Sequence, residues 1–179
     1  VKRTPAGAFE SWIEVEHEDA STTSPMGFNR DASVMYMEDS RGRDTAALFA
    51  LDLASGKSTL LAEDAKADVE NLMSCPATGT VQAAGFTYER LKWKVLDASI
   101  QADLDALKAV DPGELTITAR TLNDDLWTVA FLSDRGPSRY FLYARATKKA
   151  TYLFTNKKNL EGLPLVPMHP VVIPSRDGL

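Results

Sequence analysis

The sequence contains few of the residues that build metal sites and disulfides. Its 179 residues include one cysteine, Cys75, and two histidines, His17 and His169. A single cysteine excludes a disulfide within the chain and leaves the redox compartment of the protein open. Because no His or Cys recurs at the spacing of metal ligands, the sequence predicts no metal site. We expect Cys75 to be a small buried side chain on a strand, as unpaired cysteines usually are.

Positive charge is also in short supply. The chain carries 20 Lys and Arg against 25 Asp and Glu, which gives a formal net charge of −5 at pH 7. Nucleic-acid-binding domains need a basic patch, and the sequence has no cluster of lysine and arginine. No apolar run approaches the length that spans a bilayer. The sequence therefore predicts no nucleic-acid partner and no membrane partner, and we expect no cofactor.

The two histidines are poor candidates for a catalytic base. His17 lies in an acidic run over residues 14–19. Such charge runs are usually solvated, so we interpret it as the exposed edge of a strand over residues 9–17. His169 lies within residues 163–174, which are too rich in proline for a central strand. We expect its side chain to be an ordinary part of a linker.

A pattern of three short apolar runs joined by tight turns occurs twice. In the first copy, the runs cover residues 34–37, 47–53 and 58–61. In the second copy, they cover residues 127–131, 139–144 and 151–154. Glycine, serine and aspartate bound these runs, which is typical of an antiparallel meander. The copies are about 92 to 94 residues apart, twice a period of about 46, and such a period is typical of four-stranded propeller blades.

A weaker copy lies midway between these two. Its apolar runs cover residues 71–76, 81–86 and 91–96. After it, apolar residues recur at helical spacing, at Ile100, Leu104, Leu107 and Val110. Asp97 and Ser99 precede them and are suitable helix caps. The sequence therefore predicts a helix over residues 98–110, inserted next to the second blade.

The predicted fold class is all-β, a partial β-propeller of about three four-stranded antiparallel blades with one inserted helix. We expect residues 1–27 to be the end of a preceding blade and a loop, residues 28–158 to form the blades, and residues 159–179 to be a linker. A chain that starts at Val1 and stops in mid-pattern at Leu179 is expected to be part of a longer protein with a seven-bladed propeller.

Three stretches carry a family resemblance. They are the turn-and-strand run at residues 40–57, the run Phe-Thr-Tyr-Glu-Arg at residues 86–90 followed by Trp93 and the helix, and residues 170–179. All three resemble parts of the prolyl oligopeptidase family of serine peptidases. The first stretch resembles the blade repeat of that family, and the second resembles an acylaminoacyl-peptidase-like bacterial branch. The third resembles the crossing from the propeller to the α/β-hydrolase domain. The resemblance implies a parent enzyme that hydrolyses peptide bonds of short peptides, with a propeller that restricts access to its active site.

No catalytic residue can be assigned to this chain. The nucleophile motif Gly-x-Ser-x-Gly does not occur in its sequence. The resemblance places nucleophile, acid and histidine in a hydrolase domain expected after the linker. It therefore implies two partners, that C-terminal domain of the same chain and a peptide substrate, and leaves the compartment open between bacterial cytoplasm and periplasm.

Three arginines occupy equivalent turns of two blades. Arg41 and Arg43 lie in the turn at residues 40–44, and Arg135 lies in the turn at residues 134–137. Such turns project from one face of a propeller, and a planar guanidinium binds a carboxylate through two parallel hydrogen bonds. The three arginines are thus our candidates for contact with substrate or with the hydrolase domain. The alternative is that they are ordinary solvated turn residues.

Two other functions fit the same fold. One is a protein-interaction propeller that stands alone without enzymatic activity, which composition and period do not separate from a peptidase propeller. The other is a carbohydrate-binding or carbohydrate-cleaving propeller, which would need carboxylates and aromatics clustered on one face. The acidic residues here are scattered, and the stretch at residues 170–179 favours the peptidase.

We predict that the chain associates with itself. An incomplete propeller exposes apolar faces at its terminal blades, and contiguous apolar surface drives association. Twofold pairing is the commonest way to bury such a face. Sedimentation velocity at micromolar concentration is expected to detect a homodimer or a soluble higher oligomer, whereas a single species of 19.6 kDa would contradict the prediction.

Overall fold

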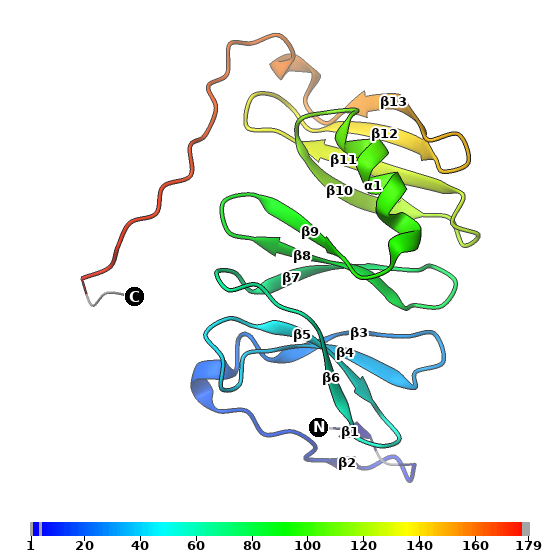
Figure 1. Cartoon of the computed structure of the whole chain (residues 1–179), viewed down its shortest axis with the longest axis vertical. Helices are drawn as coiled ribbons and strands as arrows, with labels where there is room; N and C mark the ends of the chain where they lie inside the picture. The colour runs from blue at the N-terminus through cyan, green and yellow to red at the C-terminus, as the bar shows by residue number, and fades with distance from the viewer. Residues whose placement is uncertain (1, 4, 177–179) are drawn as a thin grey trace. The chain divides into compact units, whose positions relative to one another are not determined.

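The computed structural model describes residues 2–3 and 5–176. The chain forms two compact units, Val1–Val69 (unit 1) and Glu70–Leu179 (unit 2). Antiparallel β-sheet dominates both units, and the α-helix of the described residues lies in unit 2 (Figure 1). In this part of the chain, no helix has the length and hydropathy needed to cross a membrane.

Unit 1 contains one four-stranded sheet and a short hairpin. In the hairpin, β1 (Lys2–Arg3) pairs with β2 (Phe9–Glu10). The sheet consists, in spatial order, of β3 (Ser24–Phe28), β4 (Val34–Asp39), β5 (Ala47–Asp52) and β6 (Ser58–Ala62). Each strand is antiparallel to the next, so chain order and spatial order agree. This is the meander predicted from the first copy of the repeat, with β3 added at one edge.

Strand β3 lies where the sequence predicts a loop, so that expectation is wrong. The strand contains Pro25 and Gly27, and its register with β4 shifts between them. Proline lacks the N–H that a central strand needs, but an edge strand or a bulge tolerates it. Because β3 is at the edge of its sheet, these two residues are compatible with a strand even though they hide its alternating pattern.

The strand predicted over residues 9–17 is also wrong. Only β2 (Phe9–Glu10) is extended within a sheet, and His17–Asp19 form the 3₁₀ turn η1. Instead of pairing with another strand, the intervening residues contribute apolar side chains to a hollow of about 500 Å³. This hollow is lined by Trp12, Ile13 and Val15 and by residues of the sheet such as Met35 and Met37. Within this segment, Ile13 is half-buried and packs against the core of unit 1, whereas Trp12 is exposed.

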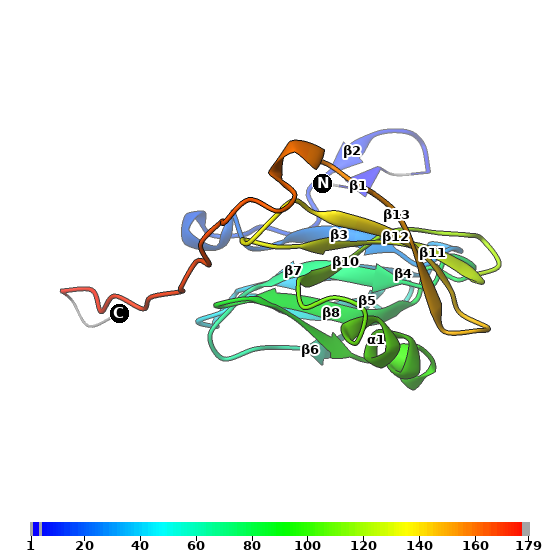
Figure 2. The same ribbon diagram turned by 90° about the horizontal axis from the view of Figure 1, so that it is seen from above.

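Unit 2 contains two sheets. The first consists of β7 (Val69–Ser74), β8 (Val81–Thr87) and β9 (Leu91–Val95). The second consists of β10 (Glu114–Arg120), β11 (Leu126–Leu132), β12 (Arg139–Ala144) and β13 (Lys149–Thr155). The 3₁₀ turn η3 (Lys158–Leu160) follows, and residues 161–176 then run on without regular structure (Figure 2). We call residues 161–176 the exit segment.

The all-β partial-propeller prediction is confirmed, with one correction to the strand count. Two sheets have the predicted four strands, but the sheet β7-β8-β9 has three. Where a fourth strand would follow β9, the chain forms the 3₁₀ turn η2 (Ala98–Ile100) and then helix α1 (Gln101–Lys108). The inserted helix therefore takes the place of the outer strand of the second blade in the chain, instead of adding to a complete blade.

A helix lies where the sequence predicts it, but α1 covers Gln101–Lys108 instead of residues 98–110, and Asp97 caps the 3₁₀ turn η2 that precedes it. The carboxylate of Asp97 accepts a hydrogen bond of 2.9 Å from the backbone N–H of Ser99, as a capping aspartate does. Ile100, Leu104 and Leu107 are buried, whereas Val110 lies beyond the end of α1 and is 37% exposed. The helix thus has a shorter apolar side than the sequence predicts.

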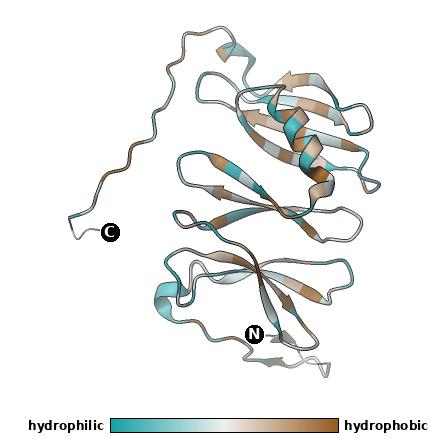
Figure 3. Cartoon of the chain, in the orientation of Figure 1, coloured by the Kyte–Doolittle hydropathy of each residue, from teal (hydrophilic) through white to brown (hydrophobic). Residues whose placement is uncertain are grey.

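The core of unit 2 joins the helix to both of its sheets. The buried apolar side chains of α1 form one hydrophobic cluster with Met73 and Ala83 of the three-stranded sheet, and with Trp127, Phe131 and other residues of the four-stranded sheet. Hydrophobic residues recur along these strands and on one side of α1 (Figure 3). The expectation that the helix packs on the second blade was therefore incomplete, because the third blade supplies most of the core around it.

A buried carboxylate adds polar contacts to this core. Asp103 of α1 is fully buried, and it accepts hydrogen bonds from the Tyr143 hydroxyl at 2.9 Å and from Arg145 Nε and Nη2 at 3.0 and 2.9 Å. Lys148 forms a further ion pair with it. Burial alone would raise the pKa of Asp103, but hydrogen bonds from Lys148, Arg145 and Tyr143 hold it below its usual range.

The same arginine extends the network toward the start of β11. Arg145 Nη1 also binds Asp124 Oδ2 at 2.6 Å, and the Trp127 indole N–H donates to Asp124 Oδ1 at 2.7 Å. The guanidiniums of Arg120 and Arg145 lie 4.5 and 5.1 Å from the Trp127 ring centroid, within the range of cation–π contact. Arg120 Nη1 also donates to the carbonyl of Ser74 at 3.0 Å, which links the two sheets of unit 2.

We predict that Asp103→Ala destabilises the protein by about 2–3 kcal/mol. Removing one member of a buried ion pair typically costs about 3–5 kcal/mol, and partial exposure of Arg145 and Lys148 reduces this figure. Urea unfolding at pH 7 measures the effect. Asp105→Ala is the matched control, because Asp105 is an exposed aspartate on the same helix; a loss as large as that of Asp103→Ala would contradict the prediction.

The pH dependence gives a second readout of the same network. Because the folded state lowers the pKa of Asp103, its contribution is present in full above the unfolded-state value of about 3.9. It is lost as the pH falls through the lower folded-state pKa. The unfolding free energy of the unaltered protein should therefore fall between pH 5 and strongly acidic conditions. This fall should be smaller in Asp103→Ala and unchanged in Asp105→Ala.

Candidate functional site

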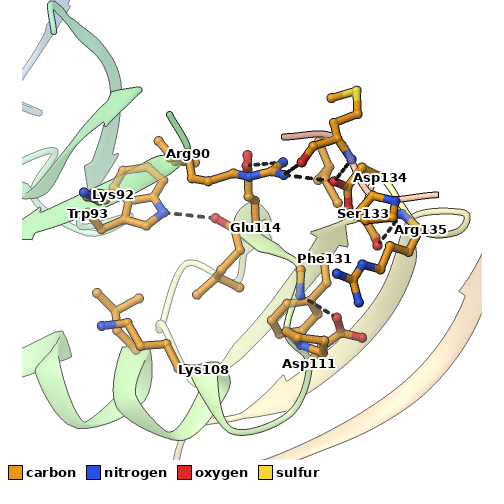
Figure 4. A pocket seen from close by; sticks show the side chains of 18 of the residues that line it. Arg90, Lys92, Trp93, Lys108, Asp111, Glu114, Phe131, Ser133, Asp134 and Arg135 are labelled. Carbon is orange, nitrogen blue, oxygen red and sulfur yellow. Dashed lines mark hydrogen bonds and ion pairs between the residues drawn. The ribbon is translucent and has the colours of Figure 1, made fainter. Parts of the chain in front are cut away.

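A cavity in unit 2 is the best candidate for a functional site. It has a volume of about 860 Å³ and lies among β9, α1, the start of β10, the end of β11 and the exit segment (Figure 4). Trp93, Leu115 and Phe131 supply apolar lining, and Pro167, Met168 and His169 line it from the exit segment. Pockets that combine an apolar lining with a few polar groups are the usual form of ligand sites.

The acidic side chains of this cavity are all paired. Asp134 and Glu114 form ion pairs with Arg90, at 2.9 and 3.4 Å. Asp111, whose side chain is buried, forms an ion pair of 2.6 Å with Arg139 and accepts a 2.8 Å hydrogen bond from the N–H of Gly113. Two guanidiniums thus compensate part of the negative charge of these three carboxylates within unit 2.

Three cations of the lining differ from these acids. Lys92, Lys108 and Arg135 are exposed, and none of them forms an ion pair with another described residue. They come from three separate elements, β9, α1 and the β11–β12 turn (Figure 4). The arrangement is suited to the binding of a carboxylate at the rim, because arginine and lysine are donors without acceptor atoms.

The three predicted arginines lie in the expected turns, in two separate units. Arg41 and Arg43 are in the β4–β5 turn of unit 1, and Arg135 is in the β11–β12 turn of unit 2. Arg41 binds Asp39 through Nε at 2.9 Å and Nη2 at 2.6 Å, and this contact lowers the pKa of Asp39. Arg43 forms an ion pair with Glu63. Of the three, Arg135 is the one that lines the cavity.

Sequence reasoning missed most of the charged residues of this cavity. Arg90 appears only as the last residue of a family-like run, and Asp134 only as a turn residue. Their mutual contact joins residues 44 positions apart, and no local spacing signals such a pair. Lys92 and Asp111 likewise meet the other lining residues only through the packing of the two sheets.

Cys75 and the two histidines do not form a reactive centre. Cys75 follows the end of β7 and is partly exposed, so the expectation of a buried strand residue is wrong. Its pKa is lowered mainly by a hydrogen bond from Thr78. His17 lies exposed in η1, and His169 lies at the cavity rim. Among the described residues, no group of three His, Cys, Asp or Glu side chains is placed to hold a metal ion.

Comparison with known proteins relates the chain to peptidases. No family model matches the sequence. The chain is 48% identical over 178 residues to dipeptidyl aminopeptidase BIII of Pseudoxanthomonas mexicana, covering 99% of the chain and 26% of that protein. It is 23% identical over 163 residues to dipeptidyl peptidase family member 6 of Caenorhabditis elegans, covering 89% of the chain and 22% of that protein. The chain thus spans about a quarter of the length of the curated relatives it matches.

We predict that Gly113→Ala deforms the cavity wall and destabilises unit 2. A Cβ at this position would lie 2.6 Å from the carbonyl oxygen of Leu132 and 3.1 Å from Asp111 Oδ1, so the backbone must move. The expected cost is about 1–3 kcal/mol, the range for overpacking, measured by thermal or urea unfolding. Gly136→Ala is the control, since no atom lies within 4 Å of its added Cβ, and equal effects of the two substitutions would contradict the prediction.

Proposed function

We propose that this chain is part of the non-catalytic propeller of a serine peptidase of the prolyl oligopeptidase family. The observation that carries the proposal is the 48% identity to a dipeptidyl aminopeptidase over 99% of the chain. The blade-like meanders of both units support it, as does the absence of the motif Gly-x-Ser-x-Gly from the sequence. Catalysis by the parent enzyme would then depend on residues that this chain does not contain.

The names of the relatives suggest the substrate of the parent enzyme. Both are named as peptidases that act on dipeptidyl units, so we propose that the parent hydrolyses short peptides and releases dipeptides. We retain the acylaminoacyl-peptidase-like bacterial branch as the position of the chain within the family, on the run at residues 86–93. The role proposed for the blades is to restrict which peptides reach the active site.

The domain divisions form part of the same proposal. The residues before β3 (Ser24–Phe28) would complete a preceding blade, the residues from β3 to 158 would form about three blades, and residues 159–179 would lead into an α/β-hydrolase domain. The exit segment supports this role, because its residues up to 176 have no regular structure and include four prolines. Proline-rich segments are extended and semi-rigid, as a connection between domains requires.

Arg135 is the residue we propose to contact a substrate carboxylate or the hydrolase domain. It lines the cavity, it is exposed, and among the described residues its guanidinium has no ion-pair partner. Arg41 and Arg43 are proposed for the domain interface. Their ion pairs with Asp39 and Glu63 would hold their side chains in fixed positions before the partner binds.

We predict that the chain alone is not labelled by a fluorophosphonate and does not cleave chromogenic dipeptidyl or acyl-peptide substrates. The reason is the missing nucleophile motif, since a serine reacts only where a base and an oxyanion site activate it. The matched comparison is a longer natural protein that contains this sequence and the residues following it, which should carry Gly-x-Ser-x-Gly and be labelled. Stoichiometric labelling of a serine in this chain, or a longer protein without the motif, would contradict the proposed function.

A further inference from the structure

Both polar groups of one backbone residue in the exit segment are bound by side chains. The N–H of Met168 donates to Asp134 Oδ2 at 2.6 Å, and its carbonyl accepts from Arg90 Nη2 at 2.9 Å. The same Arg90 Nη2 also donates to Asp134 Oδ2 at 2.9 Å, which closes the arrangement (Figure 4). Arg90, Asp134 and the backbone of Met168 are called the clasp.

The clasp combines residues from distant parts of unit 2. Arg90 lies immediately before β9, Asp134 lies in the turn between β11 and β12, and Met168 is 78 residues beyond Arg90. Glu114, at the start of β10, also faces the Arg90 guanidinium at 3.4 Å. Both turns must therefore be in place before the exit segment can be held, so the contact depends on the folding of both sheets.

The bonds of the clasp are of a strong kind. Each joins a charged group to a backbone group or to an opposite charge, and such hydrogen bonds are roughly twice as strong as neutral ones. The N–H of Met168 and then the Arg90 guanidinium lower the pKa of Asp134, so the carboxylate is ionised at neutral pH. The geometry and the charge state thus favour the same contact.

The exit segment is suited to being held in this way. Pro167 and Pro170 flank Met168 and His169, and each proline also restricts the residue before it to extended conformations. A segment that is already extended loses little conformational entropy on binding. Met168 is 67% exposed, and the clasp contacts its backbone groups.

We infer that Arg90 and Asp134 are positioning residues that fix the path of the exit segment across the cavity. Held at Met168, the segment supplies Pro167, Met168 and His169 to the cavity lining. Insofar as it leads into a catalytic domain, which rests on the proposed function, the clasp also sets the point from which that domain starts. A peptide that enters the cavity would then meet a wall fixed by both sheets.

Selective labelling with ¹⁵N-methionine tests the clasp in the whole chain. The sequence has five methionines, so the amide spectrum of the unaltered protein contains five signals, and each substitution to methionine described below adds a sixth. In the unaltered protein, the Met168 amide proton should be shifted downfield and protected from exchange with water. Arg90→Met removes the donor to the Met168 carbonyl and the cation beside Asp134, which accepts from the Met168 N–H. The exit segment should then be released, and exchange of the Met168 amide should speed up by about tenfold or more, the factor expected for losing a charge-assisted hydrogen bond.

Arg135→Met is the matched control. It removes the same charge from the same cavity, one residue away from Asp134, but Arg135 takes no part in the clasp. The Met168 signal should therefore keep its position and protection. Asp134→Ala should release the segment as Arg90→Met does, whereas Arg90→Lys should restore part of the protection, since lysine donates as a point charge without the fork.

Buried methionines report whether each variant still folds. Met35, Met37 and Met73 lie in strands β4 and β7, and their signals should not move in any of these variants. If Arg90→Met disturbs them, the comparison is made with Arg90→Lys and Asp134→Asn, which are smaller changes. The inference would be overturned if the Met168 amide of the unaltered chain exchanged as fast as that of an unstructured peptide. Equal effects of Arg90→Met and Arg135→Met would overturn it as well.

This outcome is independent of the proposed function. The spectrum needs no catalytic domain, so an intact clasp in a chain from a non-enzymatic parent would remove the proposed function and leave the clasp. If Met168 is mobile and the longer protein is a serine peptidase, the clasp is removed and the proposed function remains.

Discussion

The buried carboxylate of Asp103 is the interaction on which the arrangement of unit 2 depends. A fourth strand would have joined the second sheet through backbone hydrogen bonds, but the backbone groups of a helix are used within the helix. Helix α1 therefore needs side chains to hold it, and its apolar residues alone do not determine its rotation and position. The donors Tyr143, Arg145 and Lys148 converge on one buried acceptor group and so specify how the helix lies on the third blade. The desolvation of the carboxylate is offset by these bonds.

From Asp103 the contacts lead to the candidate site. Arg145 connects the carboxylate to Asp124, and Arg120 connects Asp124 to the Ser74 carbonyl of the other sheet. With the helix and both sheets held together, Leu104 and Lys108 of α1 face the same cavity as residues of β9 and β11. The cavity is therefore a product of the helix insertion, since a fourth strand in place of α1 would present different side chains there.

Local patterns in the sequence were enough to predict the strands of complete meanders and the helix. Residues 139–144 are an example, where an apolar run between two turns coincides with β12. Prediction failed in β3, because an edge strand tolerates a proline such as Pro25, which usually ends a strand. It also failed over residues 9–17, where the alternation of side chains reflects the lining of a hollow and not the pairing of strands. The cavity was beyond reach for another reason. Its charged pairs join residues far apart in sequence, and only the packing of two sheets brings them together.

Trp127 gives unit 2 an internal optical reporter. The chain has three tryptophans, and Trp127 is fully buried with two guanidiniums near its ring, whereas Trp12 is 36% exposed in unit 1 and Trp93 lines the cavity. One of those guanidiniums belongs to Arg145, which also holds the helix through Asp103. The electronic environment of the indole thus changes when the helix leaves the sheet, even if every strand stays paired. Once Trp12 and Trp93 are replaced, absorption and emission of Trp127 should therefore respond to helix undocking, which backbone circular dichroism of so short a helix would hardly register.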